Sequence, residues 1–221
     1  MRGVFDIVGP VMIGPSSSHT AGAVRLGLMA RKILGEPVAK ARIVLHGSFA
    51  ETYLGHGTDK ALIAGIMGFA PDDERIRDAL QLAQGSGMEF RFQKAVLDGA
   101  HPNTAELQLL GTGGRETRVR GASIGGGNIL VTSIDGYAVE LSGLYPALLF
   151  IHQDRPGIIA MVTRVMAKYR LNIANLRSSR QQRGGSALTV MELDDAPPEK
   201  VLEECRLLAP IEAAMSVPAI S

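Results

Sequence analysis

The sequence predicts an α+β protein with two domains. Two observations indicate this fold class. Up to about residue 87 the apolar residues recur mainly at the spacing of helices, and from Met88 onward they alternate as they do in strands. Residues 143–146 then form a short stretch with glycine and proline, after which the pattern begins again. We therefore expect an N-terminal α/β domain with a mixed or antiparallel sheet over residues 1–143, and a second domain over residues 147–221.

The first domain is expected to begin with helices that pack on a strand. Each helix is indicated by apolar residues three and four positions apart, and the strand by alternating, β-branched residues. We expect an apolar entry segment over residues 4–12, helices over residues 21–34, 61–69 and 72–84, and a strand over residues 40–46. The stretch 47–60 is predicted to be a loop of glycine, hydroxyl, imidazole and charged groups, with Thr58 or Asp59 as the N-cap of the next helix.

Five strands are predicted for the remainder of the first domain. Turn signals separate some of them, at residues 111–114 and 135–136. The strands are expected over residues 88–96, 105–110, 116–122, 129–134 and 137–141. Between two of them, residues 125–127 are three successive glycines, which either bring backbone amides close to an anion or form a β-bulge or a flexible corner.

The second domain is expected to have the element order βαββαβ. Its strands are predicted over residues 147–152, 172–179, 186–193 and 211–217, and its helices over residues 158–169 and 199–208. This order, over roughly seventy residues, is that of a complete ferredoxin-like unit.

The composition is that of a globular protein with little net charge. Apolar residues make up 46% of the chain, and 23 Lys and Arg against 22 Asp and Glu give a formal charge of +1. Because positive and negative charges are nearly equal in number, the composition argues against nucleic acid or a membrane surface as the main partner. No apolar run is long enough to span a bilayer and the N-terminus shows no export signal, so we expect a cytoplasmic protein.

Cys205 is the only cysteine in the sequence. A single cysteine excludes an intrachain disulfide, and it cannot supply the three or four thiolates that usually hold an iron–sulfur cluster. We expect Cys205 to be a buried, unreactive thiol in the last helix, and we predict no metal ligand in this chain.

A stretch rich in hydroxyl groups, residues 14–22, precedes and begins the first predicted helix. It contains Ser16, Ser17, Ser18, His19 and Thr20. Free N–H groups and the helix dipole favour an anion at a helix N-terminus, so these hydroxyls could bind a carboxylate or a phosphate beside a titratable imidazole. The alternative is a capped helix whose additional serines bond only to water.

Two further stretches repeat this combination of glycine and polar groups. His56 lies between glycines, with Thr58 and Asp59 shortly after it, and Asn128 follows the glycine run. We expect these residues to lie beside the hydroxyl-rich stretch and to bind the same substrate, with His19 and His56 in proton transfer. We expect His46 and His101 to be structural, and His152 to be structural or regulatory.

The second domain resembles an ACT domain. The resemblance rests on DRPG at residues 154–157, on the helix that follows, and on LNIA at residues 171–174. ACT domains typically pair through their sheets or helices, and many bind an amino acid at that interface. The resemblance therefore implies a homodimer through this domain and a regulatory ligand site. The implied ligand residues are Asp154, Arg155, Gly157, Asn172 and Ile173.

Nearly the whole chain resembles the beta subunit of bacterial iron–sulfur-dependent L-serine dehydratase. Four motifs in this order support the resemblance: GPSSSHTAG, GSFAETYLGHGTDKALIAGIMG, HPNTAEL and SIGGGNI. The first domain, which the resemblance makes a substrate-binding domain, is also similar to the intervening domain of some phosphoglycerate dehydrogenases. That domain shares the fold and an anion-binding role.

The dehydratase resemblance implies a reaction, a cofactor and a partner. Members of that family convert L-serine to pyruvate and ammonia without pyridoxal phosphate. Their [4Fe–4S] cluster belongs to the alpha subunit, or to the alpha portion of single-chain members, and acts as a Lewis acid at the substrate hydroxyl. Since this chain has one cysteine, it fits the two-chain type with a cysteine-rich alpha subunit. The alternative is a purely regulatory module that senses serine or another anion.

Overall fold

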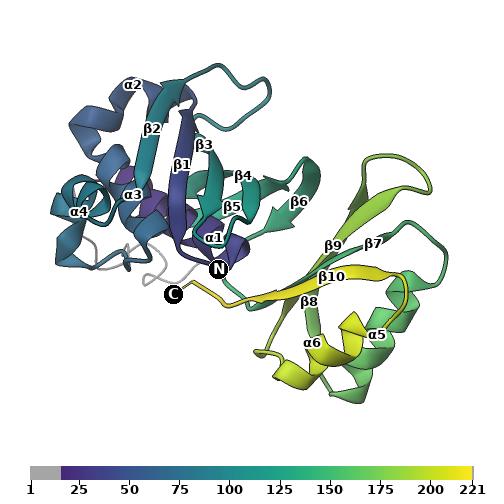
Figure 1. The fold of residues 1–221 in the computed structure, drawn as a ribbon. Coiled ribbons are helices and arrows are strands. Elements are labelled where there is room, and N and C mark those ends of the chain that lie inside the picture. Colours follow the sequence, from purple (N-terminus) through teal and green to yellow (C-terminus); the bar gives the residue numbers. More distant parts are fainter. Residues whose placement is uncertain (1–15, 221) are drawn as a thin grey trace, which may run out of the picture. The chain divides into compact units, whose positions relative to one another are not determined.

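The computed structural model describes residues 16–220 of the chain (Figure 1). The predicted entry segment over residues 4–12 lies outside the described residues, as do Gly14 and Pro15 of the hydroxyl-rich stretch. Among the helices that are described, none combines the length and the apolar character needed to cross a membrane.

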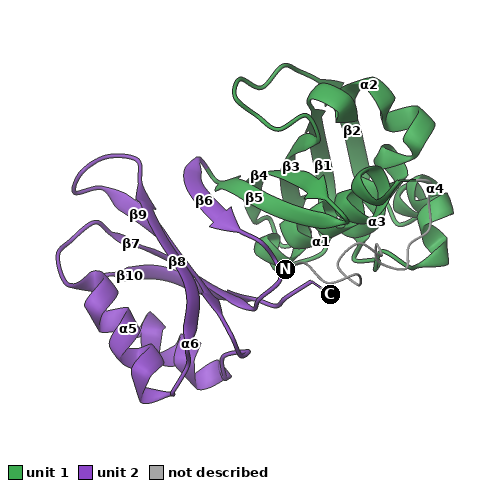
Figure 2. Ribbon diagram, turned by 180° about the vertical axis from the view of Figure 1, so that it is seen from behind, with its two compact units in different colours: residues 1–135 green, residues 136–221 purple. Residues whose placement is uncertain are grey.

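The chain divides into two compact units, residues 1–135 and residues 136–221 (Figure 2). The strand over residues 137–141 is thereby grouped with the second unit. The domain limits at residues 143 and 147 stay a prediction.

The first unit is a sheet with α1 packed on one of its faces and α3 packed on α1 (Figure 1). Its helical elements are the π-helical turn η2 (Ser17–Ala21), α1 (Gly22–Leu34), α2 (Gly47–His56), α3 (Thr58–Met67), the 3₁₀ turn η3 (Glu74–Asp78) and α4 (Ala79–Gly85). Its strands are β1 (Val38–Leu45), β2 (Glu89–Lys94), β3 (Thr104–Gly111), β4 (Glu116–Gly125) and β5 (Asn128–Ile134), in the spatial order β2-β1-β3-β4-β5. β1 and β2 are parallel and the other neighbours antiparallel, which confirms the expected mixed sheet.

The stretch predicted to be a loop over residues 47–60 is helical, so that prediction was wrong. α2 and α3 run through it and are separated by Gly57, whose φ of 69° ends α2. Phe49 and Ala50 of α2 are buried. Because a helix in a protein is stabilised mainly by tertiary packing, these contacts override the glycines and hydroxyls that indicated a loop.

The helix predicted over residues 72–84 is divided into η3 and α4. The Asp73 side chain accepts a hydrogen bond from the Arg75 backbone N–H at 2.9 Å and so caps η3 rather than a longer α-helix. The amphipathic pattern correctly indicates a helical segment, but it does not distinguish a 3₁₀ turn from an α-helix at its start.

Two glycines set the close crossing of α1 and α3. A Cβ atom at Gly27 would lie 2.4 Å from the Leu62 carbonyl oxygen, and one at Gly65 would lie 2.0 Å from that of Val24. Neither position has room for a side chain. The crossing fixes where the first turn of α3 lies with respect to η2, which precedes α1.

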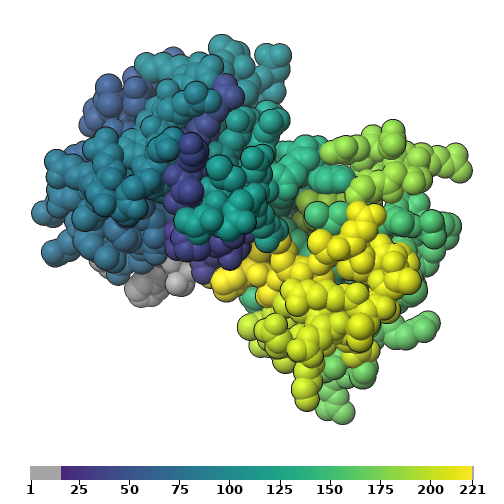
Figure 3. All heavy atoms as spheres, viewed as in Figure 1, coloured from purple at the N-terminus to yellow at the C-terminus, as the bar shows by residue number. Residues whose placement is uncertain are grey.

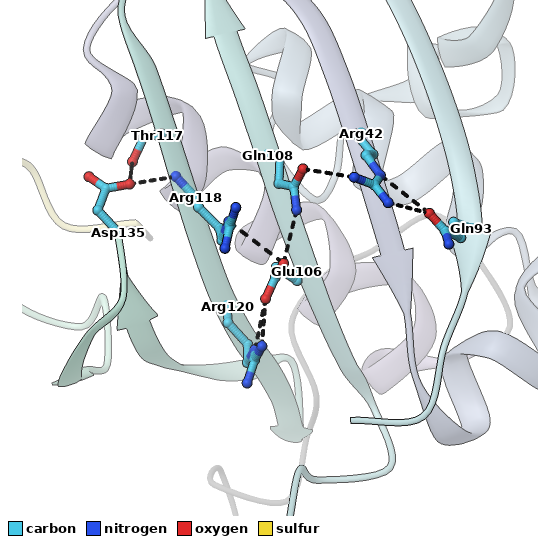
Figure 4. Close-up of polar contacts among 8 residues, drawn as sticks. All are labelled: Arg42, Gln93, Glu106, Gln108, Thr117, Arg118, Arg120 and Asp135. Atoms are coloured by element: carbon cyan, nitrogen blue, oxygen red, sulfur yellow. Dashed lines mark hydrogen bonds and ion pairs between the residues drawn. The ribbon is translucent and has the colours of Figure 1, made fainter. Parts of the chain in front are cut away.

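The other face of the sheet carries a ladder of polar side chains (Figure 4). Glu106 on β3 is 8% exposed and accepts hydrogen bonds from Arg120 at 2.6 Å and from Gln108 at 3.1 Å. Burial alone would raise the pKa of Glu106, but these two hydrogen bonds outweigh it and hold the pKa below its ordinary value. Arg42 extends the ladder to Gln93 and Gln108. β1 is mostly buried, but Lys40 is exposed and Ala39 and Arg42 are half-buried, so only part of this strand reaches the surface of the first unit, whose atoms are drawn in Figure 3.

The second unit has the predicted ferredoxin-like order. The elements of this order are β7 (Ala147–Gln153), α5 (Ile158–Lys168), β8 (Ile173–Arg180), β9 (Ser186–Leu193), α6 (Glu199–Arg206) and β10 (Ile211–Val217). β6 (Tyr137–Leu141) precedes them in the chain and is not a strand of their sheet. The sheet order is β10-β7-β9-β8 and every neighbouring pair is antiparallel. The predicted α+β fold class is therefore confirmed.

The core of the second unit lies between this sheet and its two helices. Phe150 and Met191 from the sheet pack with Val162 of α5 and Val201 of α6. Cys205 belongs to the same core, and burial raises the pKa of its thiol to about 11. The expected inert, buried thiol is confirmed.

Candidate functional site

The hydroxyl-rich stretch forms the π-helical turn η2, which leads directly into α1. Ser16 is the N-cap, and its side-chain oxygen accepts a hydrogen bond from the His19 backbone N–H at 3.3 Å. His19 therefore lies inside the first helical turn, whereas the sequence predicted a loop before the helix. Short π-helical segments occur frequently at functional sites, because they re-aim side chains without ending the helix.

His19 is held on both sides of its ring. Its Nδ1 lies 3.3 Å from Ser16 Oγ, and its Nε2 lies 3.2 Å from Ser48 Oγ on α2. The ring centroid of His56 is 4.8 Å away with the planes at 89°, and that of Phe49 is 5.4 Å away. Burial, and secondarily the neighbouring His56, lower the pKa of His19. A neutral imidazole at working pH can accept a proton.

The junction of α2 and α3 places further polar groups beside η2. His56 is the last residue of α2 and is exposed, and Gly57 is the N-cap of α3. Thr58 and Asp59 lie within the first turn of α3 and are 0% and 6% exposed, so the prediction that one of them is the N-cap was wrong. Burial raises the pKa of Asp59, against the opposing effect of the Lys60 and Asp59 backbone amides. α3 packs against η2.

Several buried polar atoms in this region have no hydrogen-bond partner. Within residues 16–220 the unpartnered side-chain atoms are Thr20 Oγ1, Arg25 Nε, Thr58 Oγ1, Asp59 Oδ1 and Ser123 Oγ. All of them belong to η2 itself or to α1, α3 and β4, and each of these three elements contacts η2. More than nine in ten buried polar groups in native proteins are paired, so a local group of exceptions indicates a place where a ligand or ordered water belongs.

Ser123 is one of the residues that the sequence alone did not single out. A Cβ atom at Gly22 would lie only 2.0 Å from Ser123 Oγ. Gly22 therefore lets this buried hydroxyl of β4 approach the junction of η2 and α1. Ser48 and Arg25 were missed as well, because Ser48 lies in the stretch predicted as a loop and Arg25 follows the polar side of the helical pattern.

The glycine run forms the corner between β4 and β5. Gly126 and Gly127 have φ of 60° and 79°, and Gly125 pairs with Asn128 across the turn, next to a register shift. This is the bulged corner that was one of the two expectations. Arg25 Nη1 donates to the Gly127 carbonyl at 3.1 Å and joins the corner to α1. Asn128 is exposed there, and no hydrogen bond of the described region joins it to the histidine pair.

The residues present do not fit an iron–sulfur cluster. The single thiol lies in the core of the second unit. Between residues 16 and 220 no group of three or more His, Cys, Asp or Glu side chains could hold a metal ion. A cluster that serves this site therefore needs ligands from elsewhere.

In the second unit, two of the predicted regulatory residues, Asp154 and Asn172, have side-chain hydrogen bonds within the chain. The Asp154 carboxylate accepts hydrogen bonds from the Gly184 backbone N–H at 2.9 Å and from Arg180 at 2.7 Å, and these hold its pKa below its ordinary value. Asn172 donates to Asp194 at 2.7 Å. Arg155 and Gly157 are exposed.

The structure does not bring these regulatory residues together within one chain. Gln153, immediately before Asp154, pairs with Ser186 at the start of β9, whereas Ile173 pairs with Leu193 at the end of β9. The two parts of the predicted ligand site therefore lie at opposite ends of the sheet.

The remaining histidines have structural contacts. His46 Nδ1 accepts from the Leu97 backbone N–H at 3.1 Å, and His101 Nδ1 accepts from that of Asn103 at 3.1 Å. His152 is 4% exposed, with Nε2 at 2.8 Å from Thr189 Oγ1. These contacts agree with the structural roles expected from the sequence.

Comparison with known proteins identifies the family. A family model described as serine dehydratase beta chain matches residues 3–133, and one described as ACT domain matches residues 147–206. The probable L-serine dehydratase beta chain of Bacillus subtilis is 44% identical over 203 residues, which cover 92% of this chain and 92% of that protein. The L-serine dehydratase beta chain of Peptoniphilus asaccharolyticus is 38% identical over 191 residues, 86% of each chain.

A second group of relatives has a different name. A D-3-phosphoglycerate dehydrogenase of Synechocystis is 26% identical over 197 residues, which are 88% of this chain and 35% of that protein. The same two-part segment therefore occurs in a longer enzyme. The match to the dehydratase beta chains is stronger and extends over nearly their full length. The chain accordingly belongs to the serine dehydratase beta chain family, and its second unit contains an ACT domain.

Proposed function

We propose that this chain is the beta subunit of an L-serine ammonia-lyase, which converts L-serine to pyruvate and ammonia. The proposal includes a cysteine-rich alpha subunit that holds a [4Fe–4S] cluster, and no pyridoxal phosphate. Two relatives named as L-serine dehydratase beta chains support it, because that name implies a partner chain. The lack of a suitable ligand set within residues 16–220 agrees with a cluster ligated by that partner.

One observation supports the proposal most strongly. His19 and His56 lie with ring centroids 4.8 Å apart, beside buried polar atoms that have no partner. A lyase acting on an amino acid needs an anion site for the carboxylate and a base for the α-proton. The region around η2 offers both.

Each residue then has a role in the proposed site. Ser16, Ser17, Ser18 and Thr20, with the free N–H groups at the start of η2, bind the substrate carboxylate. Thr58, Asp59 and Asn128 are proposed as further contacts. His19 and His56 act in proton transfer, and the lowered pKa of His19 keeps its ring neutral and able to accept a proton. A [4Fe–4S] cluster held by the partner chain, when bound, would supply Lewis-acid chemistry.

The ACT unit is proposed to bind a regulatory amino acid near Asp154, Arg155, Gly157, Asn172 and Ile173. The two parts of this set lie at opposite ends of one sheet. In a homodimer through the ACT units, the Asp154 part of one chain could lie next to the Asn172 part of the other chain. This arrangement explains how residues that are separate in one chain could hold one ligand.

The alternative is a regulatory module without catalysis. It is favoured by the match of the same two-part segment to D-3-phosphoglycerate dehydrogenases, enzymes named for another reaction. In that case the region around η2 would sense serine or another anion. The two candidates differ in whether the chain binds serine without its partner.

Co-expression with the cysteine-rich alpha subunit tests the proposal. We expect a brown, oxygen-sensitive complex that forms pyruvate and ammonia from L-serine without added pyridoxal phosphate. The matched control is the alpha subunit expressed alone and reconstituted in the same way. An intact complex with a full cluster that forms no pyruvate would contradict the proposed function.

A further inference from the structure

We propose that the Asp59 carboxylate is the acceptor for the α-ammonium group of the substrate, so that the site selects a zwitterionic amino acid over the corresponding hydroxy acid. This inference rests on the proposed function and assigns one substrate group to one side chain. It accounts for the buried Oδ1 atom of Asp59, which has no hydrogen-bond partner among the described residues.

The Asp59 carboxylate is buried and only partly hydrogen-bonded. Asp59 is 6% exposed, and its Oδ1 atom has no hydrogen-bond partner. The amides of Asp59 and Lys60 lower its pKa, but burial raises it by more. Acidic residues in the first turn of a helix are common, but they are normally hydrated. A buried carboxylate with a free oxygen is therefore unusual.

No Lys, Arg or His side chain of the described residues forms a salt bridge with Asp59. Lys60 is adjacent in sequence, yet its side chain is exposed and interacts with Asp59 only through space. Buried charges in proteins are generally paired. An ammonium group provides both the missing charge and the missing donor.

Asp59 lies in the first turn of the helix that packs against η2. It lies three residues after His56, whose ring contacts that of His19. It lies on α3, which packs against η2, where the free N–H groups and hydroxyls suit a carboxylate. The site thus offers donors on η2 and an anionic acceptor on α3. This pair of opposite groups matches the two ends of a zwitterion.

Among the described residues, the other unpartnered groups include hydroxyls but no second carboxylate. Thr58 Oγ1 and Thr20 Oγ1 are also buried without partners. A hydroxyl can donate or accept, so these groups fit either end of the substrate. Asp59 is the one anion among the unpartnered groups, and as a carboxylate it is only an acceptor. The negative charge on Asp59 therefore favours a positively charged ligand group.

The test compares L-serine with glycerate, which carries a hydroxyl where L-serine carries the ammonium group. In the complex with the alpha subunit we expect Asp59→Asn to raise the KM for L-serine by about 10- to 100-fold, the usual effect of one charge-assisted hydrogen bond. Inhibition by glycerate should stay the same or strengthen, because a buried anion near its binding site has been removed. Asp72→Asn, at an exposed aspartate, is the matched control and should change neither value.

Three outcomes would overturn the inference. If L-serine and glycerate lose affinity in parallel, Asp59 serves the carboxylate end or the fold. If neither affinity changes, Asp59 does not contact the substrate. If the wild-type complex binds glycerate as tightly as L-serine, no ammonium acceptor operates, and this last measurement needs no variant to fold.

Failure of the proposed function would look different. The wild-type complex would then form no pyruvate from L-serine, whatever residue occupies position 59. The preference for L-serine over glycerate can still be measured by calorimetry in such a complex. Loss of that preference in Asp59→Asn would support the ammonium contact even without turnover, and its persistence would exclude the contact.

Discussion

Thr58 in the first unit and Thr189 in the second are both almost completely buried, at 0% and 1% exposure. Their hydroxyl groups are in opposite situations. Thr189 Oγ1 is bonded to His152 and Ser178, each at 2.8 Å, whereas Thr58 Oγ1 has no partner. The same residue type is thus part of a completed network in one unit and unsatisfied in the other.

The contrast extends to the residues predicted to bind ligands. Around η2 the predicted substrate residues Thr20, Thr58 and Asp59 keep buried atoms without partners. In the ACT unit the corresponding groups of Asp154 and Asn172 are bonded within the chain. In the first unit these polar atoms remain available to a ligand or to ordered water. In the ACT unit a ligand of Asp154 Oδ2 or of the Asn172 amide would compete with existing hydrogen bonds.

The largest expected effect is on catalysis. His19→Ala should reduce L-serine deamination at least about 100-fold, because it removes a proposed proton-transfer group held between Ser16 and Ser48. Assembly with the alpha subunit should be unchanged, as measured by size-exclusion chromatography. Gln81→Ala, at an exposed position of α4, is the control. Wild-type turnover in His19→Ala would exclude the role.

The next largest effect concerns stability in the second unit. Thr189→Val should destabilise the protein by about 1–3 kcal/mol, because it leaves the buried Nε2 of His152 without a partner. Urea unfolding followed by circular dichroism measures this change. A variant as stable as the wild type would show that the internal network of the ACT unit contributes little.

The matched substitution in the first unit should behave in the opposite way. Thr58→Val removes a hydroxyl that has no bond to lose, so the free chain should be unchanged or more stable by about 1 kcal/mol. The affinity of the complex for L-serine should fall. A loss of stability equal to that of Thr189→Val would remove the contrast between the two units.

The smallest effect is a difference in pH dependence between two carboxylates. The folded pKa of Asp154 is lowered, so its charge stabilises the native state above about pH 4, and this contribution is lost as pH falls through the folded pKa. The pKa of Asp59 is raised in the folded state. Its ionisation therefore lowers the stability of the native state, and this cost develops as pH rises from the unfolded pKa, about 4, through the higher folded pKa.

Asparagine variants distinguish the stabilising charge of Asp154 from the destabilising charge of Asp59. Asp154→Asn should be less stable than wild type at pH 7, with the gap closing toward pH 3. Asp59→Asn should be at least as stable as wild type at pH 7, with its advantage also disappearing in acid. Urea midpoints between pH 3 and pH 7 measure both, and shifts of equal sign would contradict the assignment of the two environments.

The sequence predicts the strands better than the beginnings of the helices. Every strand of the second unit lies within about two positions of its predicted range. β7 and β9 are buried at most of their positions, so a short apolar run between turn residues indicates them rather than an alternating pattern. The helix α2 was missed because it depends on packing around Phe49, which no local pattern reveals.

The candidate site was predicted in part for the same reason. The sequence singled out His19, His56, Thr58 and Asp59 because histidine, hydroxyl and acidic groups beside glycines are unusual, and the structure places them on η2 and at the junction of α2 and α3. Ser123 was not found, because its place against Gly22 depends on the packing of β4 on the start of α1. Contacts between segments that are distant in sequence are not visible in local composition.

The central claim is that the polar groups around η2 are one part of a substrate site that a partner chain completes. Calorimetric titration of L-serine tests it most directly, first into this chain alone and then into its complex with the alpha subunit. We predict no saturable binding to the chain alone, and binding of one L-serine per beta chain in the complex. Tight binding to the chain alone, unchanged when the alpha subunit is added, would contradict the claim and favour the sensor.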